Sequence, residues 1–89
     1  MFSVYVLRSV MTGRFYTGYT SDLSHRIKQH NHGITKSTQH EGPWELVHQE
    51  QFATRSEALR RERYLKTGKG REELKRLLVL VEVVSRSAG

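Results

Sequence analysis

The chain has 89 residues, of which 36% are hydrophobic, and it contains no cysteine. A chain this short holds one compact domain, and four Tyr, three Phe and one Trp supply apolar surface for its core. The lack of cysteine excludes disulfide bonds and thiolate metal sites and suits a reducing cytoplasm, where we expect the protein. No stretch approaches the roughly 20 apolar residues of a membrane span, and the first ten residues lack a signal-peptide pattern.

The charge balance is strongly basic. Fifteen Lys and Arg residues against nine Asp and Glu give a formal net charge of +6. Such a protein attracts polyanions and releases their condensed counterions on binding. Nucleic acid is therefore the leading partner, although many small basic proteins use their charge only for solubility.

Two strand patterns open the chain. Residues 2–7 and residues 14–20 are rich in β-branched and aromatic side chains, and a turn candidate at Thr12–Gly13 separates them. These patterns predict an antiparallel hairpin.

The register of this hairpin decides where its tyrosines point. If Tyr5 lies opposite Gly18, then Tyr16 lies opposite Leu7, and both phenols project from one face of the sheet. A slip of one residue would send one phenol to the other face.

A short amphipathic helix is predicted over residues 23–30, after several N-cap candidates at residues 20–22. Arg26 and His30 are four residues apart and would lie on the same flank of that helix. A polar loop over residues 31–43 follows, and residues 44–52 resemble a third strand.

The second half of the chain reads as two helices. A capping-box pattern at residues 54–57 opens a helix to about Thr67, with Gly68 as its stop. An apolar stripe at Leu74, Leu77, Leu78 and Val81 predicts the last helix. We expect one domain over residues 1–83 and a flexible tail over residues 84–89.

Glu62 is the least ordinary residue of the predicted second-last helix. It falls within the apolar stripe that Ala58, Leu59 and Leu65 define. A buried carboxylate costs several kcal/mol unless it is paired or bound to a cation. Alternatively, Glu62 lies at the edge of the stripe and pairs with an arginine such as Arg26.

These residue types suit phosphodiester cleavage, which needs activated water, neutralisation of phosphoryl charge and help for the leaving oxygen. Arg26 could hold a phosphate in its planar fork, and a carboxylate such as Glu62 could bind a divalent ion. A phenol acts as a base only if its pKa falls well below about 10. Each of these residues has an ordinary structural role as well.

Other segments offer weaker signals. Residues 35–38 carry hydroxyls and a cation suited to phosphate contacts, or form an ordinary solvated loop. The basic segment 66–71 lacks the order of a nucleotide-binding phosphate loop but could contact DNA. Five histidines, including His30, His32 and His40, raise the possibility of a zinc site, although their spacing does not show that they converge.

In sequence order, these segments resemble the GIY-YIG nuclease superfamily. Residues 3–5 (S-V-Y) and residues 16–18 (Y-T-G) resemble the two halves of the signature. Residues 20–31 resemble its first-helix segment, residues 42–47 its third strand, and residues 58–62 the segment with its metal-binding glutamate. The likeness is closest to short single-domain bacterial members and extends to the amino-terminal nuclease domain of UvrC.

The resemblance implies an α/β (α+β) fold, with a small three-stranded antiparallel sheet flanked by helices in the order β-β-α-β-α-α. It implies a divalent-metal-dependent DNA endonuclease with one Mg²⁺ or Mn²⁺ ion held by Glu62. Tyr5 and Tyr16 would activate or position water, Arg26 would stabilise the phosphate, and His30 would relay a proton or contact the phosphate. Gly18 would be the glycine of the motif.

The implied substrate is DNA, which includes branched or damaged DNA in repair or recombination, and a protein partner could deliver it. The expected DNA contacts are Lys28, Asn31, Thr35, Lys36, Ser37, Thr38, Lys66 and Lys69. The alternative is a non-catalytic DNA- or RNA-binding module on the same fold. Such a module has no reason to keep a buried Glu62. The sequence leaves the oligomeric state open.

Overall fold

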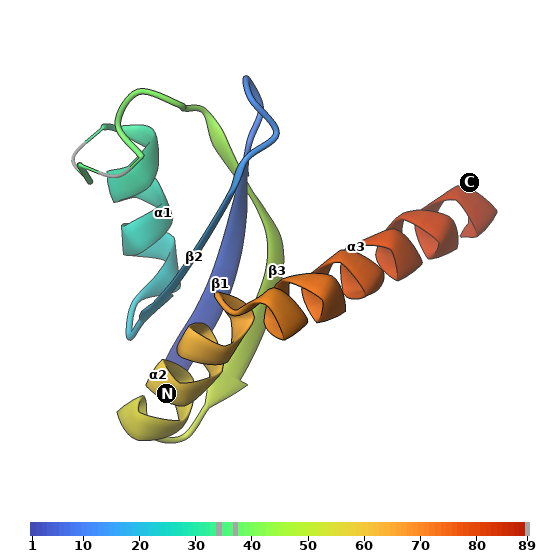
Figure 1. Cartoon of the computed structure of the whole chain (residues 1–89). Coiled ribbons are helices and arrows are strands. Elements are labelled where there is room, and N and C mark those ends of the chain that lie inside the picture. The colour runs from blue at the N-terminus through green and yellow to red at the C-terminus, as the bar shows by residue number, and fades with distance from the viewer. Residues whose placement is uncertain (34, 37, 89) are drawn as a thin grey trace.

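The computed structural model describes residues 1–33, 35, 36 and 38–88, and the side chains of this part as far as residue 79. Its elements are β1 (Phe2–Ser9), β2 (Phe15–Thr20), α1 (Leu23–Asn31), β3 (Trp44–Phe52), α2 (Arg55–Leu65) and α3 (Gly68–Ala88), as Figure 1 shows. The three strands form one antiparallel sheet. The predicted α+β fold and its β-β-α-β-α-α order are therefore confirmed.

The sheet has the strand order β2-β1-β3, so β1 is central and both other strands are edges. Tyr5 pairs with Gly18 and Leu7 pairs with Tyr16, as predicted, which places both phenols on one face. The hairpin turn uses Gly13 at a φ of 76°, a left-handed conformation that glycine adopts at little cost.

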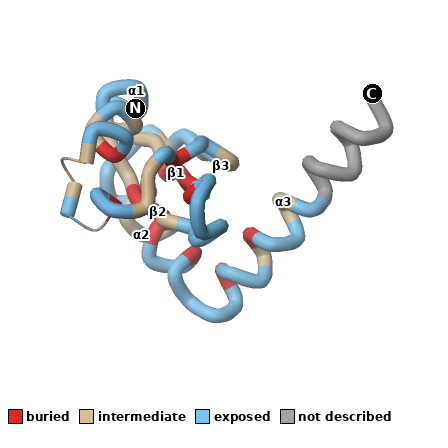
Figure 2. Tube along the Cα trace, turned by 90° about the horizontal axis from the view of Figure 1, so that it is seen from above, coloured by how far each residue is buried: buried red, intermediate tan, exposed pale blue. Residues whose placement is uncertain are grey.

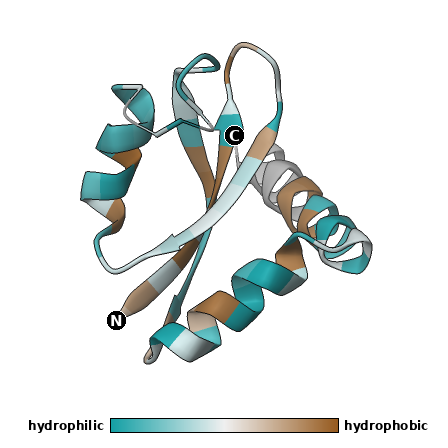
Figure 3. Cartoon of the chain, turned by 60° about the vertical axis from the view of Figure 1, so that its left-hand side comes forward, coloured by the Kyte–Doolittle hydropathy of each residue, from teal (hydrophilic) through white to brown (hydrophobic). Residues whose placement is uncertain are grey.

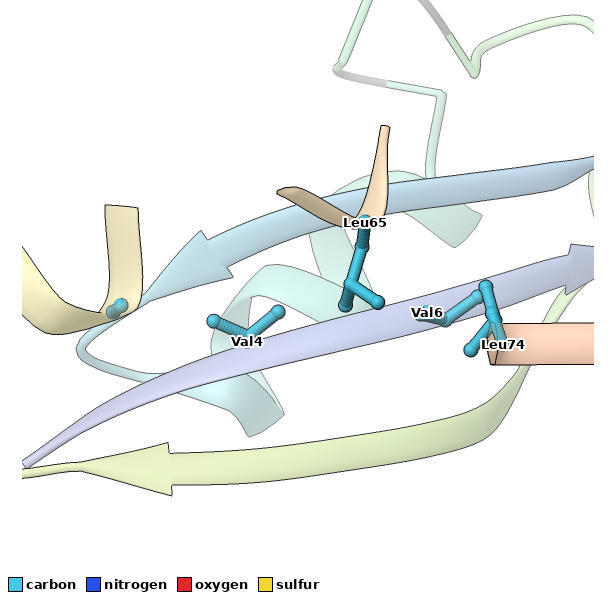
Figure 4. Packing of buried hydrophobic residues seen from close by; sticks show 5 residues of the cluster. Val4, Val6, Leu65 and Leu74 are labelled. Carbon is cyan, nitrogen blue, oxygen red and sulfur yellow. The ribbon is translucent and has the colours of Figure 1, made fainter. Parts of the chain in front are cut away.

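Both faces of β1 are buried, which explains its nearly continuous apolar sequence. On one face, Val4 and Val6 pack against α2 and the start of α3 through Ala58, Leu65 and Leu74 (Figure 4). Figure 2 shows that the buried residues gather around β1 and the helices that cover it.

The opposite face carries a second core. Tyr5, Leu7 and Trp44 are buried there and pack against Leu23 and Ile27 of α1. Figure 3 shows α1 as a mostly hydrophilic helix with its hydrophobic positions toward the sheet. Helices therefore cover both faces of a sheet with only three strands.

Side chains cap both shorter helices. The Asp22 carboxylate accepts from the backbone N–H of His25 at the start of α1. At the start of α2, the Thr54 hydroxyl accepts from the backbone N–H of Glu57 and donates to the Glu57 carboxylate, so a capping pair forms where it was predicted.

The junction of α2 and α3 differs from expectation. Gly68 begins α3 and has no left-handed φ, so it is not the helix-ending glycine that was predicted. The close approach occurs at Gly70, where a Cβ atom would lie 1.9 Å from the carbonyl oxygen of Tyr64. Only glycine fits this point, because the first turn of α3 lies directly against the end of α2.

The last helix, α3, continues through Ala88. The flexible tail expected over residues 84–89 stays a prediction. The proposed domain boundary at residue 83 stays a prediction. No helix within the described residues is long and apolar enough to cross a membrane.

Candidate active site

The candidate site begins with the fit of Tyr5 over Gly18. A Cβ atom on Gly18 would lie 2.6 Å from the phenol oxygen of Tyr5, 2.8 Å from its Cζ and 3.2 Å from Cε1 of Tyr16. The two distances to Tyr5 are shorter than real Cβ contacts, so glycine is required for the ring of Tyr5 to lie across β2 in this position. This gives the motif glycine a physical reason: it leaves room for the catalytic candidate on the neighbouring strand.

His30 holds the buried phenol of Tyr5 from the side of α1. Both residues are 1% exposed, and Nε2 of His30 lies 2.9 Å from the Tyr5 oxygen. On its other side, Nδ1 lies 2.7 Å from the hydroxyl of Thr38, which donates to the carbonyl of Thr35 at 3.4 Å. That hydroxyl therefore accepts from Nδ1–H, which leaves Nε2 to accept the phenol proton.

The electrostatics of this pair agree with that assignment. Burial, with the nearby charge of Arg26, lowers the pKa of His30 to about 4, so its ring is neutral at pH 7 and can accept a proton. Burial also raises the pKa of the Tyr5 phenol, against the opposing influence of Arg26. Tyr5 is thus a protonated donor to His30 in the free protein.

Arg26 lies on α1, half-buried beside both tyrosines. Its interaction with Tyr5 raises the pKa of the guanidinium, although burial acts in the opposite direction, so the group stays charged. One of its nitrogens donates to the side-chain oxygen of Gln29 at 3.0 Å. A fixed cation beside two phenols is suited to bind a phosphate oxygen.

Tyr16 is the more open of the two tyrosines. It is half-buried, and its ring lies 4.8 Å from the ring of His30 and 6.3 Å from that of Tyr5. The ring of Trp44 lies 6.5 Å from that of Tyr16, edge to face. Of the two phenols, Tyr16 is therefore better placed to meet water or a substrate.

Glu62 is 9% exposed, so its predicted burial is confirmed. Its partner is Lys66, one helical turn later, at 2.5 Å, and not Arg26. Burial and Tyr16 raise the pKa of Tyr5 more than the charge of Glu62 does, which is the smallest of these causes because α2 covers the opposite face of the sheet. The i,i+4 spacing of Glu62 and Lys66 was the sequence signal for this pair.

The donor set for a metal ion is small. Within the described residues, no three His, Cys, Asp or Glu side chains gather as a metal-binding group. His32 and His40 are exposed while His30 is buried. A single carboxylate fits Mg²⁺ or Mn²⁺ better than zinc, because Mg²⁺ in particular keeps several waters and uses substrate phosphates as ligands.

The residues predicted to contact DNA fall into two groups: exposed side chains, and side chains with contacts inside the protein. Exposed cations at Lys28, Lys36 and Lys69 are free to meet a phosphate, and Lys66 is half-exposed but paired with Glu62. Thr35 is half-buried, and Ser37 lies outside the described residues.

Two of the residues predicted to contact DNA, Asn31 and Thr38, have structural roles in the folded chain. Thr38 is 1% exposed and bound to His30, so it does not reach DNA from this position. Asn31 uses its side chain to bind the backbone of Trp44, with its oxygen 2.6 Å from the Trp44 nitrogen. Trp44 in turn donates from its indole to the carbonyl of Thr38 at 2.9 Å. This support of His30 from α1, the loop and β3 was not evident from sequence patterns, because it depends on contacts across the loop.

Comparisons with known proteins agree with this geometry. Residues 1–75 match the family described as the GIY-YIG catalytic domain. A UPF0213 protein of Staphylococcus saprophyticus is 47% identical over 64 residues, which cover 71% of this chain and 78% of that protein. A UPF0213 protein of Staphylococcus aureus is 43% identical over 65 residues, 72% of this chain and 78% of the relative.

A solved structure extends the comparison. The solution NMR structure of a UPF0213 protein from Bacillus halodurans is similar, with 38% identity and a TM-score of 0.54. The likeness covers 86% of this chain and 85% of that one.

Proposed function

Since the chain belongs to the GIY-YIG catalytic domain family, a nuclease superfamily, we propose that it is a divalent-metal-dependent endonuclease that hydrolyses phosphodiester bonds in DNA. One observation carries the proposal: Tyr5 from β1 meets His30 and Arg26 from α1 and lies within electrostatic reach of Glu62 from α2. A proton acceptor and a phosphate-binding cation thus meet at Tyr5 although they are distant from it in sequence, and α2 carries the carboxylate of Glu62 on the other side of the sheet.

Each residue has a role that follows from its surroundings. Arg26 binds the non-bridging oxygens of the scissile phosphate and offsets the charge that builds up there. Tyr16, the more open phenol, positions the attacking water. Tyr5 donates its phenolic proton in a hydrogen bond to the neutral Nε2 of His30, and Thr38 holds the ring of His30 in the orientation that accepts it. This contact fixes the phenol oxygen of Tyr5 beside Arg26.

Glu62 is the residue that would hold the metal. When bound there, a divalent ion supplies charge for the phosphoryl oxygens and lowers the pKa of its bound water. Lys66 occupies the same carboxylate in the free protein and keeps the buried charge paired.

Cleavage assays with Mg²⁺ or Mn²⁺ on branched, nicked, single-stranded and duplex DNA test the proposal. We expect Glu62→Gln and Tyr16→Phe to lower kcat by at least about a hundredfold on whichever DNA the wild type cuts. Glu72→Gln, on the exposed side of α3, and Tyr64→Phe, on the outside of α2, are matched controls that should leave cleavage unchanged. Full activity in both site variants would refute the assignment.

The same assay separates this function from a binding module on the same fold. A wild-type protein that binds DNA with a steep salt dependence but cuts none of these substrates would be the non-catalytic alternative. The pairing of Glu62 with Lys66 is the observation that favours this second reading, because it shows that the carboxylate has a protein cation available.

A further inference from the structure

A groove of about 590 Å³ lies between β2 and α3. It exists because β2 is an edge strand and α3 moves progressively away from the sheet toward its C-terminal end (Figure 1). Leu74, early in α3, is 4% exposed and packs on the core, whereas Val79, little more than one turn later, is 58% exposed. The space that opens between this helix and the strand is the β2–α3 groove.

The floor of the groove is apolar. Leu65 and Leu74 are buried beneath it, and Leu78 is half-buried beside them. Phe15, at the start of β2, lines the groove and is 44% exposed. An aromatic ring left this open on an edge strand offers a flat face for another flat group to stack on.

The rim of the groove is cationic. Arg14, Lys66, Arg71 and Lys75 line it, and none of the described lining residues is acidic. Arg14 is paired with Glu41 at 2.6 Å and Lys66 with Glu62. Arg71 and Lys75 are exposed, and neither forms an ion pair within the described part of the chain.

A nucleotide has the matching chemistry, with a flat base and an anionic phosphate. The volume lies in the range of roughly 300–1,000 Å³ that is typical of small-ligand sites, and it is too small for a paired duplex. The groove adjoins the candidate active site, because Tyr16 lines it and Lys66, which also lines it, pairs with Glu62. An acidic peptide would satisfy the rim but would have no relation to that site.

We propose that the β2–α3 groove binds one or two unpaired nucleotides next to the scissile phosphate, with a base stacked on Phe15 and phosphates held by Arg71 and Lys75. The inference rests on the proposed function and deepens it, because it gives the substrate an unpaired segment beside the point of cleavage. A base can stack there without hydrogen bonds that read its identity, so the groove selects for an unpaired strand and not for a sequence.

Equilibrium binding without metal tests the groove apart from catalysis. A fluorescein-labelled 12-nucleotide oligo(dT) and a blunt duplex of equal length are titrated with the full chain, and anisotropy is recorded between 50 and 200 mM salt. We expect Phe15→Ala to weaken oligo(dT) binding roughly tenfold with an unchanged salt slope. Arg71→Gln combined with Lys75→Gln should weaken it to a similar degree and reduce the salt slope by about 1.4.

Matched controls use exposed residues of α2 outside the groove. Tyr64→Ala removes an exposed aromatic ring, and Arg60→Gln with Arg63→Gln removes two exposed cations. Both should bind oligo(dT) like the wild type, apart from the small loss that any lowered net charge causes. Losses as large as those of the groove variants, or no loss in the groove variants, would overturn the proposal.

Localisation of the oligonucleotide gives an independent answer. In ¹H–¹⁵N spectra of the wild type, oligo(dT) should shift the amide signals of residues 14–17 and 71–78. Shifts confined to other surfaces, or no binding by the wild type, would refute the groove. Cleavage with intact binding in the groove variants would refute the groove and leave the nuclease standing. Groove binding by a wild-type protein that cleaves none of the substrates would refute the nuclease and leave the groove standing.

Discussion

Gly18 shows how a single missing side chain shapes the candidate site. Its hydrogen faces the phenol of Tyr5, and that phenol reaches His30 only because β2 carries no Cβ atom at this point. The three residues come from two strands and a helix, so the fit of one controls the position of the others.

Gly18→Ala tests this fit. The added methyl group must displace the ring of Tyr5, which breaks its contact with His30 and disturbs the core under α1. We expect a loss of about 1–3 kcal/mol in the free energy of unfolding, measured with urea, and altered ring signals of His30 in NMR spectra. Wild-type stability together with unchanged His30 signals would show that the ring of Tyr5 does not lie over Gly18.

His30 makes stability depend on pH. Its pKa is about 4 in the folded protein against 6.5 for an ordinary histidine. Between these two pH values the unfolded chain therefore binds a proton at His30 that the folded chain does not bind. Stability is complete above about pH 6.5 and falls as the pH approaches 4. Between pH 7.5 and pH 5, urea unfolding of the wild type should show a loss of roughly 2 kcal/mol.

The change in the free energy of unfolding with pH, and not its absolute value, identifies His30 as the titrating group. His30→Gln should lose far less stability over the same interval, even if it is less stable at pH 7.5. His32→Gln, which changes an exposed histidine, should keep the wild-type slope. An equal slope in all three proteins would assign the effect to other groups.

Lys66 competes with any cation for Glu62. Because the ammonium lies 2.5 Å from the carboxylate, its removal should expose the charge to a metal ion. Lys66→Met should bind Mn²⁺ several-fold more tightly than the wild type in calorimetric titrations without DNA. Lys69→Met, an exposed lysine in the first turn of α3, is the control and should leave Mn²⁺ affinity unchanged. Weaker binding in Lys66→Met would show that Lys66 does not compete.

At the scale of elements, the short α2–α3 junction decides where α3 goes. α2 ends at Leu65 and α3 begins at Gly68, so the direction of α3 depends on close contact across very few residues. The Arg61 guanidinium braces the junction, binding Glu50 of β3 at 2.9 Å and Glu73 of α3 at 3.1 Å. The β2–α3 groove exists because the junction fixes the direction in which α3 leaves α2.

Two glycines of the junction form a matched pair. Gly70→Ala places a Cβ atom 1.9 Å from the Tyr64 carbonyl, which forces α3 away from α2, and we expect a loss of at least about 1–3 kcal/mol in thermal or urea unfolding. Gly68→Ala meets no atom within 4 Å and should change stability by less than about 0.5 kcal/mol. Equal effects of the two substitutions would contradict the close approach at Gly70.

At the scale of the whole molecule, the charge of +6 is carried by a domain with two sheet faces covered and two sheet edges open. Exposed cations occur on α1 at Lys28, in the loop at Lys36 and along the rim of the groove at Arg71 and Lys75. If the chain binds DNA as proposed, we expect the whole surface to contribute to the long-range attraction and the site to orient the strand.

Binding of DNA by the wild type should weaken strongly with salt. If about three phosphates are neutralised, the association constant falls more than tenfold between 50 and 200 mM salt, because counterions are released on binding. Anisotropy titrations measure the fall, and urea unfolding in the same buffers checks that the protein stays folded. A flat salt dependence would mean that the net charge has no part in binding.

The sequence by itself determined the order of the elements and the placing of Tyr5, Tyr16, Arg26 and His30 on strands and helix. It offered the observed hairpin register and the burial of Glu62 each as one of two alternatives. These features follow from local rules: alternation in strands, helical spacing and capping side chains. The same rules predicted a helix-ending role for Gly68, which the structure corrects.

Only the tertiary structure decided what these residues touch. Thr38 supports His30 and does not face DNA, Glu62 pairs with Lys66 and not with Arg26, and the groove appears where α3 leaves β2. Each outcome depends on how elements that are distant in sequence pack across the sheet or the loop. That packing decides which side chains come into contact. Periodicity along the chain contains no such information, because it fixes which face a side chain takes and not which neighbour it finds there.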